Sequence, residues 1–309
     1  MNRLKGIVLS MGLLFLSGCA GTMGVKMKQD VSANVTEKVE SKYTGPKRRV
    51  GVIDFENKTA YGQTRLGQAA SDILITELVK TGKFIVVERE KVNKLLEEQK
   101  LGLTGAIDPN TAAQMGKVLG LNAIVTGAIS NFGVRTTGSD YLITQTKRQE
   151  ATCTIDVRVV DAETGQILFA DSGKGVSKVG SGSFLGLGTR GGYAESIEGD
   201  ALRAAVSQMT INITSQINKK PWSCRVADVD GSTVYLDAGM DSGLEVGQKL
   251  AAYKLGREIK SPQTGLVIGR TEEKLGELVI DSFFGENGSK AIVKTGRSPG
   301  PGDLCRMAQ

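Results

Sequence analysis

Cys19 is the residue whose surroundings point to a defined chemistry. It follows Leu16-Ser17-Gly18 at the end of a short apolar run, and the basic residues Arg3 and Lys5 precede that run. A positive head, an apolar core too short for a mature spanning helix and small residues before a cleavage point are typical of a secretory signal. Lipoprotein processing attaches acyl chains to a cysteine at this place and cleaves just before it. The sequence therefore predicts a signal peptide over residues 1–18, with acylated Cys19 as the first mature residue.

The lipid anchor predicts where the protein resides. Ala20 follows Cys19, whereas an aspartate there commonly keeps such lipoproteins in the inner membrane of Gram-negative cells. We therefore expect a lipid-anchored protein of the outer membrane that faces the periplasm. One acyl chain at ~0.8 kcal/mol per buried CH2 anchors marginally, but multiple acylation, palmitate included, makes attachment effectively permanent. Two alternatives stay open: an ordinary secretory peptide with an incidental cysteine, and a transmembrane anchor.

Three further cysteines, Cys153, Cys224 and Cys305, would lie in a compartment that oxidises thiols. Because Cys224 and Cys305 bracket the last segment of the chain, we predict a disulfide between them, contributing roughly 4 kcal/mol in the chain-entropy model. Cys153 lies inside an alternating strand pattern, so pairings with it are less favoured and we expect it to be buried and free. The cysteines lack paired C-x-x-C spacing, which disfavours zinc.

Catalytic chemistry has no support in the sequence. Histidine is absent, which removes imidazole bases and leaves the serines without the usual activating partner. Residues 186–191 (GLGTRG) match a dinucleotide fingerprint as a string, but polar Gly/Ser sequence precedes them and favours an insertion loop. Residues 228–231 (DVDG) favour a turn over a calcium loop, because the remaining ligands are missing. We predict a protein that is not an enzyme, with no cofactor and no metal.

The charge pattern gives no nucleic-acid signal. The net charge is +6, and removal of Arg3 and Lys5 with the signal leaves +4. The run Lys47-Arg48-Arg49 precedes a predicted strand and is expected to be a solvated linker end. Residues 19–46 are polar and end at Pro46, so we interpret them as a lipidated tether. We expect no nucleic-acid partner.

Residues 47–220 combine strand-like and helix-like periodicity. Helix one takes Thr64 as its N-cap and has Val79 on its apolar face, and residues 152–161 with 166–170 form a hairpin. The pattern predicts an α/β (α+β) domain, in which helices flank a mixed sheet. The expected strands are 49–55, 84–87 and 122–130, and the expected helices are 64–80, 90–100, 108–119 and 194–218.

Residues 221–309 change character, with short β-rich runs separated by glycines and no convincing helix. This composition predicts a small all-β C-terminal domain, a compact barrel or sandwich. The expected strands are 226–229, 233–236, 248–253, 267–271, 274–282 and 290–294.

Four segments resemble the CsgG family: residues 50–59 (VGVIDFENKT), 86–90 (VVERE), 120–127 (GLNAIVTG) and 157–167 (VRVVDAETGQI). The likeness extends over about residues 49–218, and the lipidation signal fits it. The resemblance implies a ring of lipidated outer-membrane subunits that forms the curli secretion channel. Each subunit would have a periplasmic α/β domain and donate two β-hairpins to a shared barrel. By order along the chain, these two hairpin insertions correspond to residues 131–151 and 171–193.

The two insertions offer few residues that could face lipid. Charged residues such as Arg135, Asp140 and Lys147 interrupt the first insertion, and Gly and Ser dominate the second, so neither shows the clean alternation of a lipid-facing strand. The apolar candidates for membrane or pore insertion are Phe132, Val134, Tyr141, Leu142, Ile143, Phe184, Leu185 and Leu187.

Two hypotheses about function remain. The first is a homo-oligomeric, non-catalytic subunit of a secretion or assembly complex, whose partner is a secreted protein or an appendage subunit. The second is a non-channel periplasmic interaction lipoprotein that supports flagellar or cell-wall assembly. The second draws on residues 231–250, whose glycine and apolar pattern resembles the C-terminal β domain of a flagellar assembly periplasmic protein. That domain would be an added contact module.

Overall fold

The computed structural model describes residues 45–98, 109–140, 144–184, 187–188, 195–263, 265 and 267–308. The predicted signal peptide, Cys19 and the tether up to residue 44 lie outside the described residues, as do Tyr141, Leu142, Ile143 and Leu185 and the side chains of Phe184 and Leu187. In the described part of the chain, no helix is long and apolar enough to cross a membrane.

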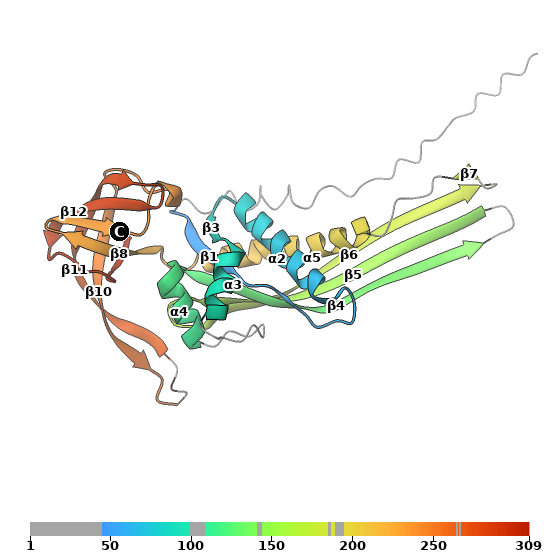
Figure 1. The fold of residues 1–309 in the computed structure, drawn as a ribbon, viewed down its shortest axis with the longest axis horizontal. Helices are drawn as coiled ribbons and strands as arrows, with labels where there is room; N and C mark the ends of the chain where they lie inside the picture. The colour runs from blue at the N-terminus through green and yellow to red at the C-terminus, as the bar shows by residue number, and fades with distance from the viewer. Residues whose placement is uncertain are drawn as a thin grey trace, which may run out of the picture. The chain divides into compact units, whose positions relative to one another are not determined.

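A mixed sheet forms the centre of the first domain (Figure 1). Its order is β3-β1-β4-β5-β6-β7, and β2 pairs with β4. Strands β3, β1 and β4 are parallel, whereas β4, β5, β6 and β7 follow one another antiparallel. The bounds are β1 (Arg48–Val52), β2 (Glu56–Asn57), β3 (Phe84–Val87), β4 (Ala123–Asp140), β5 (Thr144–Asp161), β6 (Ile167–Phe184) and β7 (Leu187–Gly188).

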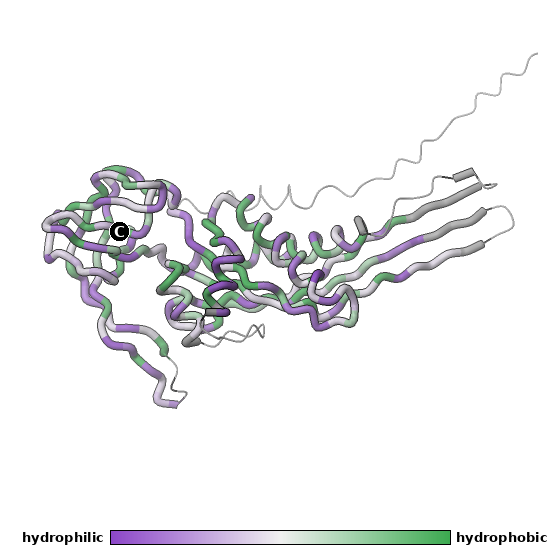
Figure 2. The backbone as a smooth tube through the Cα atoms, in the orientation of Figure 1, coloured by the Kyte–Doolittle hydropathy of each residue, from purple (hydrophilic) through white to green (hydrophobic). Residues whose placement is uncertain are grey.

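Helices cover both faces of this sheet. Helices α2 (Gln63–Lys80) and α5 (Glu195–Ile217) contribute Leu74, Leu78 and Ile213 to the larger core. Helices α3 (Arg89–Glu98) and α4 (Pro109–Leu119) contribute Val92 and Met115 to a separate, smaller core. Hydrophobic residues are interleaved with hydrophilic ones along the strands, as expected where alternate side chains enter a core (Figure 2). The predicted mixed α+β architecture is confirmed.

Two glycines let α5 lie directly on β6. A Cβ at Gly173 would stand 2.3 Å from the Ala205 carbonyl oxygen, and one at Gly175 would stand 1.9 Å from that of Ala201. Neither distance is compatible with a side chain. The glycine-rich sequence of β6 therefore sets how closely the helix approaches the sheet.

The C-terminal strands form a closed barrel in the order β10-β11-β12-β9-β8-β13. Trp222, Leu236, Leu250 and Leu278 belong to its core. The predicted small all-β domain is thus observed. The bounds are β8 (Ser223–Asp230), β9 (Thr233–Leu236), β10 (Lys249–Lys260), β11 (Val267–Phe284), β12 (Gly288–Gly296) and β13 (Leu304–Met307), with the short helix η1 (Met240–Ser242) after β9.

Several local predictions were wrong. Thr64 lies inside α2, whose N-cap is Gly62 at φ 70° with no side-chain cap, and Val79 is 54% exposed. The strands predicted at 122–130, 152–161 and 166–170 are parts of 18-residue strands. Residues 267–271 and 274–282 belong to one strand, β11, and β13 was not predicted. The missed outer parts of β4 and β5 are mostly polar and carry no hydrophobic alternation to mark them, and β13 has only four residues.

Candidate functional site

The main candidate is the far half of strands β4, β5 and β6, which we call the strand extension: residues 131–140, 144–154 and 174–184 (Figure 1). Its strands stay in register from Asn131↔Thr154 to Asp140↔Gln145, and from Thr154↔Lys174 to Thr144↔Phe184. Of the two regions predicted as insertions from the CsgG resemblance, residues 131–140, 144–151 and 174–184 lie on it. These residues belong to one three-stranded sheet that is continuous with the central sheet.

Phe132 and Val134 are the predicted insertion residues whose side chains are described. Phe132 is 7% exposed and belongs to the larger core, with its ring centroid 4.9 Å from that of Tyr61. Val134 is partly buried against the same core. Phe132 is thus used in the core, Val134 keeps part of its surface exposed, and membrane insertion of residues 131–151 and 171–193 stays a prediction.

The described surface of the strand extension is mostly polar, with Val176 as an exposed apolar side chain on β6. Arg135, Thr136, Thr137 and Arg148 are exposed, and Lys178 Nζ lies 3.3 Å from Glu150 Oε1 on the neighbouring strand. A lipid-facing strand instead alternates apolar residues outward. This part of the extension is therefore suited to water or to a polar protein surface.

The strand extension has a free edge along β4. The outer edge of β4 pairs with β1 at residues 123–125 and with β2 at Ala128 and Ile129. Beyond Ile129, no other described strand pairs with this edge. Unpaired backbone N–H and C=O groups along a strand are a ready template for another strand.

The opposite edge, along β6, is only partly covered. Strand β7 pairs with β6 at Ser183 and Phe184. Near the other end, the backbone N–H of Lys174 donates to Gln208 Oε1 at 2.9 Å, so α5 satisfies one group of this edge. The two edges of the extension thus differ: one is open, and the other carries a short reversed strand.

The barrel meets the first domain around the N-terminal end of β1, and we call these contacts the junction. The backbone N–H of Lys47 donates to the Ser242 carbonyl at 2.7 Å. Trp222 Nε1 donates to the Lys47 carbonyl at 3.1 Å. The Asn122 amide donates to the Ser223 carbonyl at 3.3 Å. Main-chain groups on both sides are therefore joined directly.

Arg48 is the central side chain of the junction, at 2% exposure. Its guanidinium donates from Nε to Asn218 Oδ1 at 3.2 Å, from Nη1 to the Pro221 carbonyl at 3.2 Å, and from Nη2 to the Lys220 carbonyl. Five donors in a rigid fork suit this set of acceptors. The predicted solvated linker end is thus wrong for Arg48, which is buried because the C-terminal end of α5 supplies its acceptors.

A small cavity of about 50 Å³ lies at the junction, lined in part by Arg49, Asn122, Cys224 and Asp237. This volume holds a few water molecules, well below the ~300 Å³ of a usual ligand pocket. Burial raises the pKa of Asp237 above its usual value, although Asp237 Oδ1 accepts the backbone N–H of Arg225 at 2.7 Å. The cavity is therefore a feature of packing.

The described cysteines occupy two different settings. Cys153 is a buried free thiol on β5, as predicted, and burial raises its pKa to about 12. Cys224 and Cys305 lie directly opposite each other on β8 and β13, both as free thiols in the structure. The structure brings the predicted pair together, and the disulfide itself stays a prediction.

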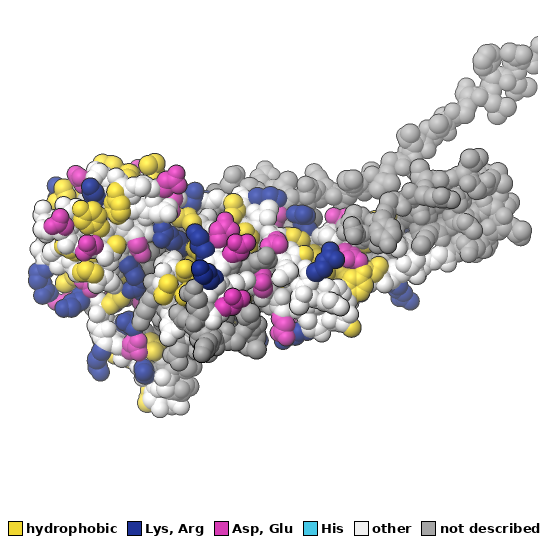
Figure 3. Space-filling model, viewed as in Figure 1, with side chains coloured by type: hydrophobic (Ala, Val, Ile, Leu, Met, Phe, Trp, Pro, Cys, Tyr) yellow, Lys and Arg dark blue, Asp and Glu magenta, His cyan; other side chains and the backbone are white. Residues whose placement is uncertain are grey.

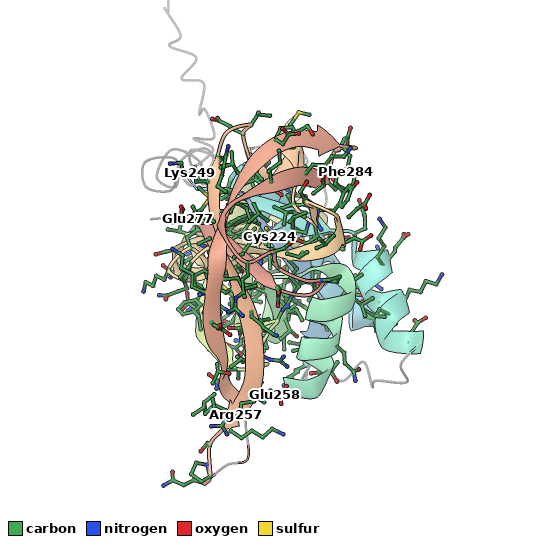
Figure 4. The ribbon with its side chains drawn as sticks, turned by 90° about the vertical axis from the view of Figure 1, so that its left-hand side faces the viewer. Cys224, Lys249, Arg257, Glu258, Glu277 and Phe284 are labelled. Carbon is green, nitrogen blue, oxygen red and sulfur yellow. The ribbon has the colours of Figure 1, made fainter. Side chains whose placement is uncertain are left out.

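Sequence reasoning missed a two-stranded arm, residues 254–260 of β10 and 267–274 of β11. Figure 4 shows Arg257 and Glu258 at its far end, away from Phe284 at the other end of β11. Glu258 pairs across the arm with Arg270 at 2.5 Å, and Gln166 Nε2 donates to the Val267 carbonyl at 2.8 Å. No local signal in the sequence marks the arm, because pairing between its two strands holds it together.

Comparison with known sequences settles the family. Residues 31–240 match the CsgG family, described as the curli production assembly/transport component CsgG. The chain belongs to the CsgG family. The match includes the central sheet, the strand extension and α2 to α5, and it ends at the start of η1.

A relative from Neisseria meningitidis serogroup B (strain ATCC BAA-335 / MC58) is NMB1126/NMB1164, which carries the name of a lipoprotein. The two sequences are 24% identical over 226 residues, which cover 70% of this chain and 95% of the relative. Family and relative together make this chain a CsgG-family lipoprotein, in keeping with a membrane-associated location that faces the periplasm.

Three solved structures align with part of this chain. Lipoprotein GNA1162 from Neisseria meningitidis is 14% identical, with 56% of this chain and 99% of that chain covered and a TM-score of 0.32. The LpoB C-terminal domain from Escherichia coli is 14% identical, with 47% and 93% covered and a TM-score of 0.32. The PelC dodecamer from Paraburkholderia phytofirmans is 12% identical, with 55% and 94% covered and a TM-score of 0.32.

Proposed function

We propose that this CsgG-family lipoprotein is a subunit of a homo-oligomeric complex at the outer membrane that serves export or envelope assembly, without catalysis. Its cargo would be a secreted protein or an appendage subunit, as in curli-like secretion. The single observation that carries the proposal is the strand extension, whose β4 edge is unpaired beyond Ile129 among the described residues.

The strand order suits assembly from identical copies. Strands β4, β5, β6 and β7 alternate in direction. In a neighbouring copy held in the same orientation, β4 therefore runs antiparallel to β7 of the first copy, so the two can pair without reversing a subunit. Such a head-to-tail contact uses two different edges, and repeated around an axis it closes into a ring.

Proline substitutions at two adjacent positions of β4 can test whether assembly depends on the open edge of this strand. The N–H of Ile53 donates to the Val125 carbonyl and that of Lys58 to the Ile129 carbonyl, so odd-numbered residues of β4 face the outer edge up to Ile129. A register shift between Ile129 and Asn131 inserts one extra residue into β4 relative to β5. From Asn131 onward, the even-numbered residues of β4 therefore face the outer edge and the odd-numbered residues face β5. The backbone of Thr136 accordingly faces the open edge, and that of Thr137 faces β5.

The Thr136→Pro variant should keep its fold and lose assembly, because proline removes an N–H from the open edge only. The matched control, Thr137→Pro, removes a bond of the inner ladder and should lower the free energy of unfolding by about 1–3 kcal/mol. The measurement is the mass of the acylated protein in mild detergent, together with its thermal midpoint. A wild-type monomer, or a Thr136→Pro variant that assembles like wild type, would contradict the proposal. Ion conductance in planar bilayers then tells a pore from a nonconducting ring.

A second candidate function uses the barrel as a docking module in a non-channel complex for flagellar or cell-wall assembly. Hydrophobic side chains are exposed on the barrel, among them Met240, Val246, Phe284 and Ile292 (Figure 3). If this surface binds a partner, Ile292→Ser should weaken capture of that partner while the ring mass stays unchanged. An unchanged set of photo-cross-linked partners in that variant would remove this candidate.

A further inference from the structure

We propose that Cys224 and Cys305 form a disulfide that fastens the first strand of the barrel to the last, and that it is made before the barrel closes. The inference depends on the periplasm-facing location of the protein and is independent of its oligomeric state. It is a covalent modification of the domain that lies mostly beyond the CsgG match.

The backbone already holds the two cysteines at bonding distance. Cys305 is the register partner of Cys224, between the pairs Leu304↔Arg225 and Arg306↔Ser223. Directly opposed residues on antiparallel strands have Cα atoms about 4.5–5.5 Å apart, inside the ~4.4–6.8 Å range of disulfides. The two side chains also share a hydrogen bond. Rotation of the side chains would therefore suffice to bring the sulfur atoms together.

The bond would join the two ends of the barrel sequence. Strand β8 is the first strand of the barrel and β13 the last, and they are neighbours only because the barrel closes. Strand β13 has four residues and is held by β8 on one side and β10 on the other. A cross-link that closes a long loop restricts the unfolded chain strongly, so it would stabilise this closure.

In the closed barrel, the two thiols would be oxidised slowly. Cys224 is 6% exposed and Cys305 is fully buried. The hydrogen bond with Cys305 and burial raise the pKa of Cys224 well above its usual value, against a weaker lowering by Arg49. Since the thiolate is the attacking species, exchange in the closed barrel would be slow in both directions.

Oxidation is therefore assigned to folding, before β13 docks. One cysteine attacks a donor disulfide, supplied by an oxidising protein or small molecule of the extracytoplasmic compartment, and a mixed disulfide forms. The other cysteine displaces the donor sulfur. The two cysteines lose two protons and two electrons, the Cys224–Cys305 bond forms, and the donor leaves as two thiols.

Alkylation of the purified full-length lipoprotein in denaturant tests the bond directly, with Cys153 as internal control. Without reductant, we expect alkylation of Cys153 alone, and after reduction alkylation of Cys153, Cys224 and Cys305. Alkylation of all three without reductant would overturn the proposal. The assay is independent of assembly, so its failure leaves the proposed function in place.

Stability and protection give two further readouts. The Cys224→Ala/Cys305→Ala variant should melt on the order of 10 °C below the oxidised wild type and close to the reduced wild type. Cys153→Ala should change the melting point by the same amount in oxidising and in reducing buffer, because Cys153 is not part of the proposed bond. Folded oxidised protein should resist dithiothreitol at least tenfold longer than unfolded protein. Equal reduction rates in the two states would overturn formation before closure.

Discussion

The strand extension and the barrel differ in whether the edges of their strands are paired. In the barrel, each of the six strands pairs with a neighbouring strand on both sides. In the extension, β4 keeps an open edge for residues 131–140. Closure completes hydrogen bonding within one chain, whereas an open edge requires a second chain to do so. The extension is thus the part whose structure calls for another subunit.

The two regions also differ in how they are held. A single large core supports the base of the extension through α2 and α5. The barrel has its own core, and it meets the first domain through the junction. Trp222, the only tryptophan in the chain, lies in the barrel core and hydrogen-bonds Lys47. Its fluorescence therefore reports on the barrel and junction, while far-ultraviolet circular dichroism reports on both regions.

Gly175→Leu should lower the free energy of unfolding more than the other variants, because it disrupts the packing at the base of the strand extension. A Cβ at this position would stand 1.9 Å from the Ala201 carbonyl oxygen, so α5 must move off β6. We expect the free energy of unfolding to fall by about 3 kcal/mol or more, measured by urea titration. The Trp222 transition should fall with the circular dichroism transition because the junction joins the two regions.

Gly133→Ala is the matched control for this substitution. Gly133 lies on β4 in the same sheet, and a Cβ there would have nothing within 4 Å. Its effect should stay within about 1 kcal/mol and can be stabilising, since alanine costs less entropy on folding than glycine. If Gly175→Leu were as mild as Gly133→Ala, the close packing of α5 on β6 would not be a determinant of the fold.

The sequence predicts those parts of the two regions in which hydrophobic side chains recur at regular spacing. Leu66, Leu74 and Leu78 mark α2 because burial against the sheet enforces helical spacing. The extension past Val134 contains mainly Thr, Gly, Ser and charged residues, so nothing in its composition indicates that β4 continues to Asp140. Its strands exist because backbone pairing continues outward from a buried base.

The same limit applies to the junction and the arm. Arg48 appears in the sequence as one of three basic residues, and its burial depends on acceptors about 170 residues away in the chain. Residues 270–274 interrupt β11 as a pattern, yet the strand runs through them because the partner β10 supplies pairing and Glu258 pairs with Arg270. Long-range partners of this kind leave no local trace in sequence.

Arg48→Met should make the barrel and the first domain unfold in separate transitions. The change keeps much of the apolar stem but leaves Asn218 Oδ1 and the carbonyls of Lys220 and Pro221 without their donor. We expect a loss of about 2–3 kcal/mol in the free energy of unfolding. The Trp222 and circular dichroism transitions, coincident in wild type, should then occur at different urea concentrations.

Coincident transitions in Arg48→Met would show that the other hydrogen bonds of the junction suffice to keep the two regions cooperative. Lys91→Met is a suitable control, because Lys91 also lies in the first domain and is exposed on α3. It should leave the two transitions together.

Asp237→Asn should give the smallest effect and concerns the barrel side of the junction. Burial raises the folded-state pKa of Asp237, so the folded protein binds a proton more tightly than the unfolded chain does. The stability contributed by the protonated form is therefore present at low pH and is lost as pH rises through the folded-state pKa, which lies above 3.8.

Asparagine at position 237 keeps an oxygen to accept the Arg225 N–H and carries no charge at any pH. The variant should lose this part of the pH dependence and be slightly more stable than wild type at pH 7, as measured by urea titration from pH 4 to 8. A wild-type stability that rises through this window relative to the variant would mean that Arg49 and Arg225 outweigh burial, and that the junction favours a charged carboxylate.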